Sequence, residues 1–189
     1  FVMMGNITTD KTYYYKDIQF RQKDITDTWN YRIIALNTFD GSKWSNAHIG
    51  QQQINFLINA LATIPTKTGT QRYGVIVMMP GLEYKTGKYD NPLTKITTAE
   101  NFYQTRRRNT IKGMHDTPIS KIVDAWQSRT TLITKFTNND DEEIINIDAD
   151  FTQVDPAAEF ICFLSGHEHY DLIGYNPGTT NLQLVLNIN

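Results

Sequence analysis

One short apolar run constrains this chain more than any other feature. Residues 160–164 are consecutive hydrophobic residues, and the run ends at Ser165-Gly166. An apolar run of this length closed by a turn signal predicts a strand covered on both faces. Glycine lets the backbone turn sharply or approach a ligand closely. We therefore expect a buried strand that opens into a loop at Gly166.

Two histidines follow that turn, His167 and His169, separated by Glu168. Imidazole is the commonest ligand of transition metals, and two imidazoles spaced i, i+2 at the end of a strand can converge on one site. Two histidines beside a glutamate in a loop can also be ordinary solvated side chains. The apolar strand in front of them favours the metal site.

The composition narrows the class of protein. With 189 residues, 40% of them hydrophobic, the chain is long enough for one domain with a sizeable core. A balance of 18 Lys+Arg against 20 Asp+Glu gives no field that would favour nucleic acid or an anionic membrane. The single cysteine, Cys162, excludes an intramolecular disulfide. The sequence shows neither a signal peptide nor an apolar run long enough for membrane insertion.

The order of the elements predicts a mixed α/β domain with layered sheets, because strands and helices alternate early and strands follow one another late. The second of the two opening strands is the more apolar, which predicts a more central place in its sheet. The other expected elements are strands at 13–20, 31–36 and 73–79, a helix capped by Ser45 or Asn46 and running to 64, a helix from 118, a hairpin of 131–136 and 144–151, and strands at 172–175 and 182–188.

Each helix has one apolar face, as expected of helices packed on a sheet. Residues 82–118 differ, because they carry little periodicity beyond a short helix pattern at 99–107. A long segment of this kind inside a domain is commonly functional. The apolar positions are Ile49, Phe56, Leu57, Ala60, Leu61 and Ile64 in the first helix, and Ile119, Ile122, Val123 and Trp126 in the second.

The segment 166–169, Gly-His-Glu-His, resembles the last signature motif of the calcineurin-like metallophosphoesterases. The Asp171-Leu-Ile-Gly that follows strengthens the likeness. The order of elements resembles the second half of that family across nearly the whole chain, although only the histidine motif is specific. The long insert at 82–118 and Asp150-Phe151 before the histidine strand are similar to phage-associated and gut-bacterial members.

The resemblance implies a four-layer α/β/β/α sandwich, present here as its C-terminal portion. Residues 1–189 would form a single domain truncated at its N-terminus, since the family's Asp-x-His and Gly-Asp-x-x-Asp motifs have no counterpart and would lie upstream of Phe1. The chain would then belong to a larger polypeptide or a virion assembly. The sequence does not favour the cytoplasm over a virion.

The chemistry implied is hydrolysis of a phosphoester by two divalent metal ions of the Mn, Fe, Zn or Mg class. The metals clamp the phosphate and lower the pKa of a bridging water, so that hydroxide attacks in line. His167 would ligate one metal and His169 the other. Asp171 either orients a ligand histidine through a hydrogen bond or is simply solvated. No residue of this chain is assigned a catalytic role, and Glu168 is given none.

Two departures from the family pattern bear on activity. The strand at 73–79 should end in a ligand histidine but ends in Met79, a soft ligand poorly matched to a hard cation that holds phosphate. His115, in the insert, is a possible substitute. Gly5-Asn6-Ile7 is either a degenerate Gly-Asn-His motif or ordinary sequence beyond a true one. By itself, this chain is expected to be inactive.

Three hypotheses therefore stay open. The first is a metallophosphoesterase domain that is active in the full polypeptide. The second is a degenerate phosphoesterase fold, a pseudoenzyme kept as a structural or interaction module. The third is an unrelated α/β binding domain in which the histidine motif is a coincidence. Bound metal separates the first from the third, and hydrolysis of an aryl phosphate separates the first from the second.

Overall fold

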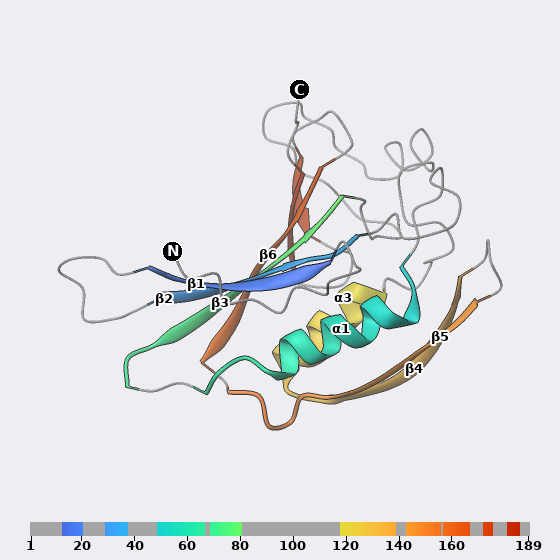
Figure 1. The fold of residues 1–189 in the computed structure, drawn as a ribbon, viewed down its shortest axis with the longest axis horizontal. Coiled ribbons are helices and arrows are strands. Elements are labelled where there is room, and N and C mark those ends of the chain that lie inside the picture. Colours follow the sequence, from blue (N-terminus) through green and yellow to red (C-terminus); the bar gives the residue numbers. More distant parts are fainter. Residues whose placement is uncertain are drawn as a thin grey trace.

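A computed structural model describes residues 13–20, 29–37, 49–66, 69–80, 118–138, 143–155, 157–166, 172–175 and 181–185 (Figure 1). These ranges form a mixed α/β fold, which confirms the predicted class. The predicted helix pattern at 99–107 lies outside the described residues. The elements are β1 Tyr14–Phe20, β2 Trp29–Ala35, α1 Gln51–Ala62, β3 Arg72–Met79, α3 Pro118–Ser128, β4 Thr131–Asn138, β5 Glu143–Asp150, β6 Ala158–Ser165, β7 Leu172–Tyr175 and β8 Leu182–Val185.

Six of the strands form one sheet in the order β1-β2-β3-β6-β8-β7. The neighbours β2, β3, β6 and β8 run parallel, and β1 and β7 are antiparallel at the two ends of the order. The antiparallel pairing of β1 with β2 and the inner place of β2 were both predicted, since the more apolar strand gains more from burial. The predicted hairpin is the separate two-stranded sheet of β4 and β5.

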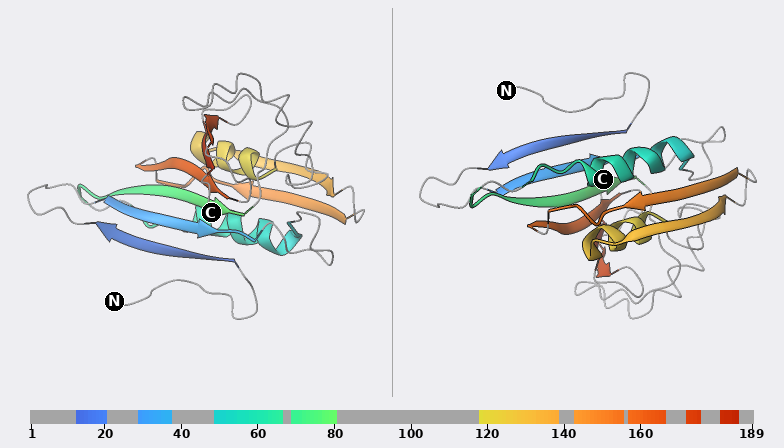
Figure 2. Two further views of the ribbon diagram at one scale, coloured as in Figure 1. Left: turned by 90° about the horizontal axis from the view of Figure 1, so that it is seen from above. Right: turned by 90° about the horizontal axis from the view of Figure 1, so that it is seen from below.

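The described layers are the six-stranded sheet, the two helices and the hairpin (Figures 1 and 2). The helices lie between the two sheets, and one core joins all three layers. Alternate residues of β3 and β5 point into this core, among them Val75, Val77, Ile145 and Ile147, as the period of two requires. Its largest members are the fully buried side chains of Trp126, Phe151, Phe163, Ile34, Ile49, Ile54, Leu57, Leu61, Ile119 and Ile122.

The start of α1 corrects the sequence prediction. Ser45 and Asn46 were the predicted caps, but the helix begins at Gln51 with Gly50 as its N-cap residue. Gly50 has extended backbone, and its carbonyl accepts hydrogen bonds from the amides of Gln53 and Ile54. Among the described residues, no side-chain capping bond is made at this end. The local sequence misleads here because Ser and Asn are strong capping residues wherever they stand.

Strand β6 agrees with its prediction only in part, because its second face is incompletely covered. The successive residues Cys162 and Phe163 point to opposite faces and are both buried, whereas Ile161 is 36% exposed. The register against β3 shifts at Ile161, where a bulge leaves this residue without a cross-strand partner between Phe160 and Cys162. The continuous apolar run therefore reflects a strand with one core face and one apolar face that the helices do not cover.

Candidate metal centre at the strand ends

The parallel strands bring their carboxyl ends to one edge of the sheet. The register pairs Ala35 with Met78, Met79 with Ser165, and Ser165 with Val185. In open α/β sheets, ligands bind in the crevice beyond this edge. The chain leaves β6 at this edge through Gly166, the residue before His167.

The predicted ligands themselves lie outside the described residues. This applies to His167, His169 and Asp171, and equally to His115. Within the described ranges there is no group of three or more His, Cys, Asp or Glu side chains that could hold a metal ion. The two-metal site therefore stays a prediction. What the structure adds is the position of the ends of β2, β3 and β6, the last of which leads to the histidine motif.

Met79 occupies the end of β3, where the phosphoesterase resemblance predicts a histidine. Its side chain is buried and belongs to the core cluster with Val75 and Val77, on the face that carries the helices. A thioether is flexible and apolar, and it fills irregular gaps of this kind. Met79 therefore contributes packing at the end of β3 and offers no hard ligand to the edge.

The end of β2 is fixed by a residue that the sequence analysis did not single out. The Gln53 side chain donates from Nε2 to the carbonyl of Asn37 at 2.7 Å and accepts from the amide of Asn37 at 2.9 Å. Gln53 is fully buried. The only sequence signal is a glutamine among the apolar positions of α1. The pair ties the first turn of α1 to the backbone directly after β2.

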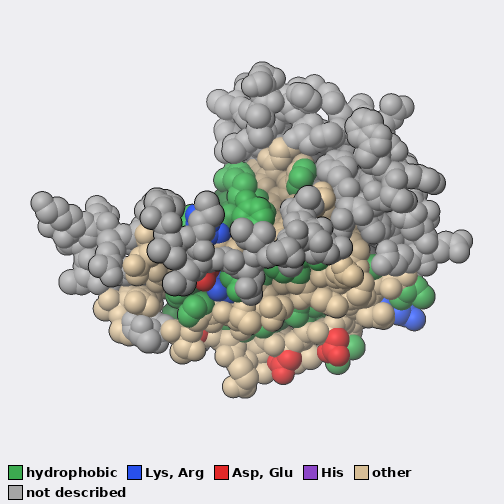
Figure 3. Space-filling model, in the orientation of Figure 1, with side chains coloured by type: hydrophobic (Ala, Val, Ile, Leu, Met, Phe, Trp, Pro, Cys, Tyr) green, Lys and Arg blue, Asp and Glu red, His purple; other side chains and the backbone are tan. Residues whose placement is uncertain are grey.

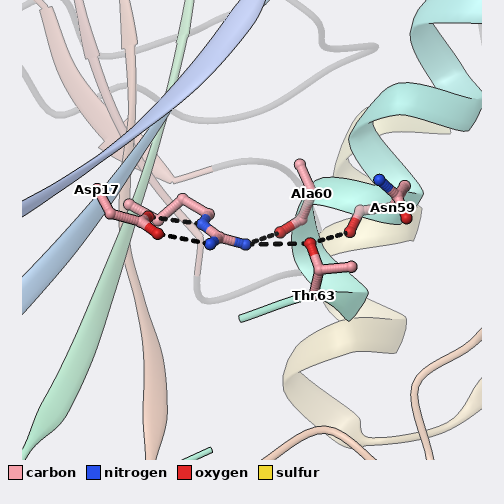
Figure 4. Close-up of polar contacts among 5 residues, drawn as sticks. Asp17, Asn59, Ala60 and Thr63 are labelled. Carbon is pink, nitrogen blue, oxygen red and sulfur yellow. Dashed lines mark hydrogen bonds and ion pairs between the residues drawn. The ribbon is translucent and has the colours of Figure 1, made fainter. Parts of the chain in front are cut away.

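A second polar connection ties the other end of α1 to the middle of β2 (Figure 4). Arg32 on β2 is buried, and its guanidinium bonds both carboxylate oxygens of Asp17 at 2.6 and 2.7 Å. Its Nη1 donates to the carbonyl of Ala60 at 2.8 Å and to the Thr63 hydroxyl at 3.2 Å. The ring of Tyr15 lies 4.2 Å from the guanidinium carbon. Through these contacts the Arg32 guanidinium joins β1, β2 and the end of α1, which is a structural role.

Burial is the main cause of the pKa shift of four groups in the described ranges, and Asp124 and Cys162 are two of them. Burial raises the pKa of the Asp124 carboxyl, and a hydrogen bond from the Asn181 amide partly offsets that shift. Burial also raises the pKa of the Cys162 thiol. A thiol that stays protonated is a poor nucleophile and a poor metal ligand. Cys162 therefore acts as a small hydrophobe, as its place in the apolar run indicated.

No family model matches the chain, and neither curated proteins nor solved structures give a significant match. Among the described residues, no helix is long and apolar enough to cross a membrane. A functional hypothesis for this protein must therefore start from its own residues: the histidine motif, and the sheet edge to which the preceding strand leads.

Proposed function

We propose that this protein is a calcineurin-like metallophosphoesterase domain that hydrolyses a phosphoester with two divalent cations when it is part of the full polypeptide. The observation that carries the proposal is the end of β6. Gly-His-Glu-His follows that strand directly, and β6 lies beside β3 in a parallel array. Parallel strands of this kind present ligand-binding loops at their carboxyl ends. In the proposed site, His167 binds one cation and His169 the other.

The finer α/β/β/α architecture is part of the same proposal. The face of the sheet opposite the helices is apolar, and Ile18, Tyr31, Ile33 and Ile76 line a cavity of about 370 Å³ there. Figure 3 shows hydrophobic side chains at the surface in a hollow on this side of the sheet. A second sheet supplied by the rest of the polypeptide would bury these side chains at the usual spacing of about 10 Å.

A degenerate scaffold is the second candidate, and Met79 favours it. The residue at the end of β3 has become part of the core and supplies no ligand. A phosphoesterase fold that has lost one ligand on β3 would bind its cations weakly and act as an interaction module. The two candidates predict different metal contents for the same polypeptide.

The experiment is elemental analysis of the purified full polypeptide beside its His167→Ala/His169→Ala double variant. A Glu168→Ala variant is the matched control, because it alters the same loop and spares both imidazoles. About two metals per chain in the parent and the control, lost in the double variant, is the expected result. Absence of metal from the parent would overturn the hydrolase proposal and leave the scaffold.

Activity is measured on the same samples with an aryl phosphate. The expected result is hydrolysis by the parent and the Glu168→Ala control and a loss of at least about 100-fold in the double variant, since the metals supply both the nucleophile and the charge stabilisation. Metal binding without hydrolysis would favour a scaffold that has kept its cations.

A further inference from the structure

The backbone of the hairpin shows which of its polar groups face outward. Asn146 on β5 accepts from Gln51 Nε2 and donates to Gln51 Oε1, both at 2.7 Å. Its amide and carbonyl therefore point toward α1 and away from β4. In an antiparallel pair, such a residue faces a partner whose own amide and carbonyl also point outward. That partner is Lys135.

The same direction holds for other residues of β4. Backbone amide and carbonyl groups point alternately to the two sides of a strand, so those of Thr131 and Ile133 point away from β5 at the outer edge of β4, as those of Lys135 do. In the part of the chain that the structure describes, no strand pairs with this edge. The other edge of the hairpin differs, because the Gln51 side chain takes the place of a neighbouring strand at Asn146. Figure 2 shows β5 as the strand nearer α1.

The side chains along this edge of β4 are exposed to solvent. Ile133 is 76% exposed, the highest value among the large hydrophobic residues described, and Thr131 and Lys135 are exposed as well. An exposed edge strand that carries a solvent-exposed isoleucine can pair with a strand of another molecule. This edge can also pair with the same edge of a second copy. The outward-pointing residues 131 and 135 lie two positions on either side of Ile133, so an antiparallel copy centred on Ile133 presents matching groups.

We propose that a second copy of this chain pairs along β4, antiparallel and centred on Ile133, to give a continuous four-stranded sheet with two hairpins. The outward amides and carbonyls at 131, 133 and 135 then meet those of the partner at 135, 133 and 131, forming up to six hydrogen bonds. Ile133 packs beside Ile133 of the partner subunit. This proposal is independent of the metal site.

Charge favours a second copy in this register. Lys135 of the partner subunit lies opposite Thr131, whose other neighbour is Asp150 on β5. The three side chains share one face, and two strand spacings separate the lysine backbone from that of Asp150 by about 10 Å, within reach of an extended lysine and an aspartate. A register centred on Lys135 would instead place two lysines directly opposite each other, which is unfavourable.

The test combines the mass in solution with a site-specific cross-link. The unsubstituted protein is expected to change from monomer to dimer as its concentration rises through the micromolar range. The association is expected to be weak because a single strand edge buries less area than a standard interface. Ile133→Cys is expected to form an intermolecular disulfide under mild oxidation. The Cα–Cα distance of a directly opposed pair, about 5.5 Å, suits that bond.

Ile144→Cys is the matched control, because Ile144 is also an exposed isoleucine on the hairpin, 57% exposed, but lies far from the proposed axis. The native Cys162 is buried and serves as the blank in the parent. Selective cross-linking at position 133 supports the proposal. A chain that stays monomeric, or that cross-links equally well through position 144, would overturn it. Circular dichroism establishes that both variants are folded.

Discussion

The side-chain amide of Gln53 pairs with both backbone polar groups of Asn37, so a glutamine on a helix completes the hydrogen bonding of a strand end. Two residues earlier in α1, Gln51 makes the same two-bond arrangement with Asn146 on the hairpin. The first turn of α1 is thereby joined to both sheets, because each glutamine side chain makes the two hydrogen bonds that a neighbouring strand would otherwise make. The Gln53 side chain is buried and its bonds to Asn37 are part-buried, whereas the bonds of Gln51 to Asn146 are exposed.

Gln53→Leu is expected to lower the free energy of unfolding by about 2–3 kcal/mol. The substitution keeps the volume but removes both bonds from the amide and carbonyl of Asn37 in a part-buried setting. Urea unfolding measures the loss. Gln51→Leu is the control, with an expected loss below about 1 kcal/mol, because water can replace its exposed bonds. Equal losses would contradict the special role of the buried pair.

Asp17→Asn is expected to destabilise the fold by about 3 kcal/mol. It leaves the buried Arg32 guanidinium without its counter-ion, and an uncompensated buried charge is costly. The double variant Arg32→Met/Asp17→Leu is expected to be more stable than Asp17→Asn, because it removes both charges. Urea unfolding of the two variants gives the comparison. A double variant less stable than the single one would indicate that the guanidinium is needed for its bonds to α1.

The Cys162 thiol is expected to resist a thiol-specific reagent in the folded protein. Its raised pKa keeps the thiolate fraction low at neutral pH, and burial blocks access. Absorbance after addition of a disulfide reagent measures the rate, with the same protein in urea as the control. We expect the unfolded protein to react at least about 100-fold faster. Rapid reaction of the folded protein would show that β6 opens readily.

Asp124→Asn is expected to gain stability relative to the parent as the pH rises. The folded pKa of Asp124 is raised by burial, so the folded state holds this proton more tightly than the unfolded state does. Stability of the parent therefore falls as the pH rises through the window above the ordinary carboxyl pKa of about 3.9, and the variant lacks this loss. The difference in Tm between the variant and the parent is expected to grow from about pH 3 to about pH 7. A constant difference would refute the assignment.

The sequence predicted the elements because hydrophobic periodicity is a local property. The buried positions Ile122, Val123 and Trp126 follow from one apolar stripe, and the β4–β5 hairpin follows from two alternating runs around an acidic turn. The histidine motif after β6 stays a prediction, because His167 and His169 lie outside the described residues. Each of these features depends on residues that are close in the sequence.

The tertiary structure decided which polar groups become partners, because that depends on distances between segments far apart in the chain. Gln53 reaches Asn37 across 16 positions, and Gln51 reaches Asn146 across 95. The same holds for Met79, whose pattern suggested a missing ligand and whose burial shows a packing role. Periodicity reports which side of an element is apolar. It carries no information about the distant group that a buried amide or guanidinium will meet, and folding alone brings the two together.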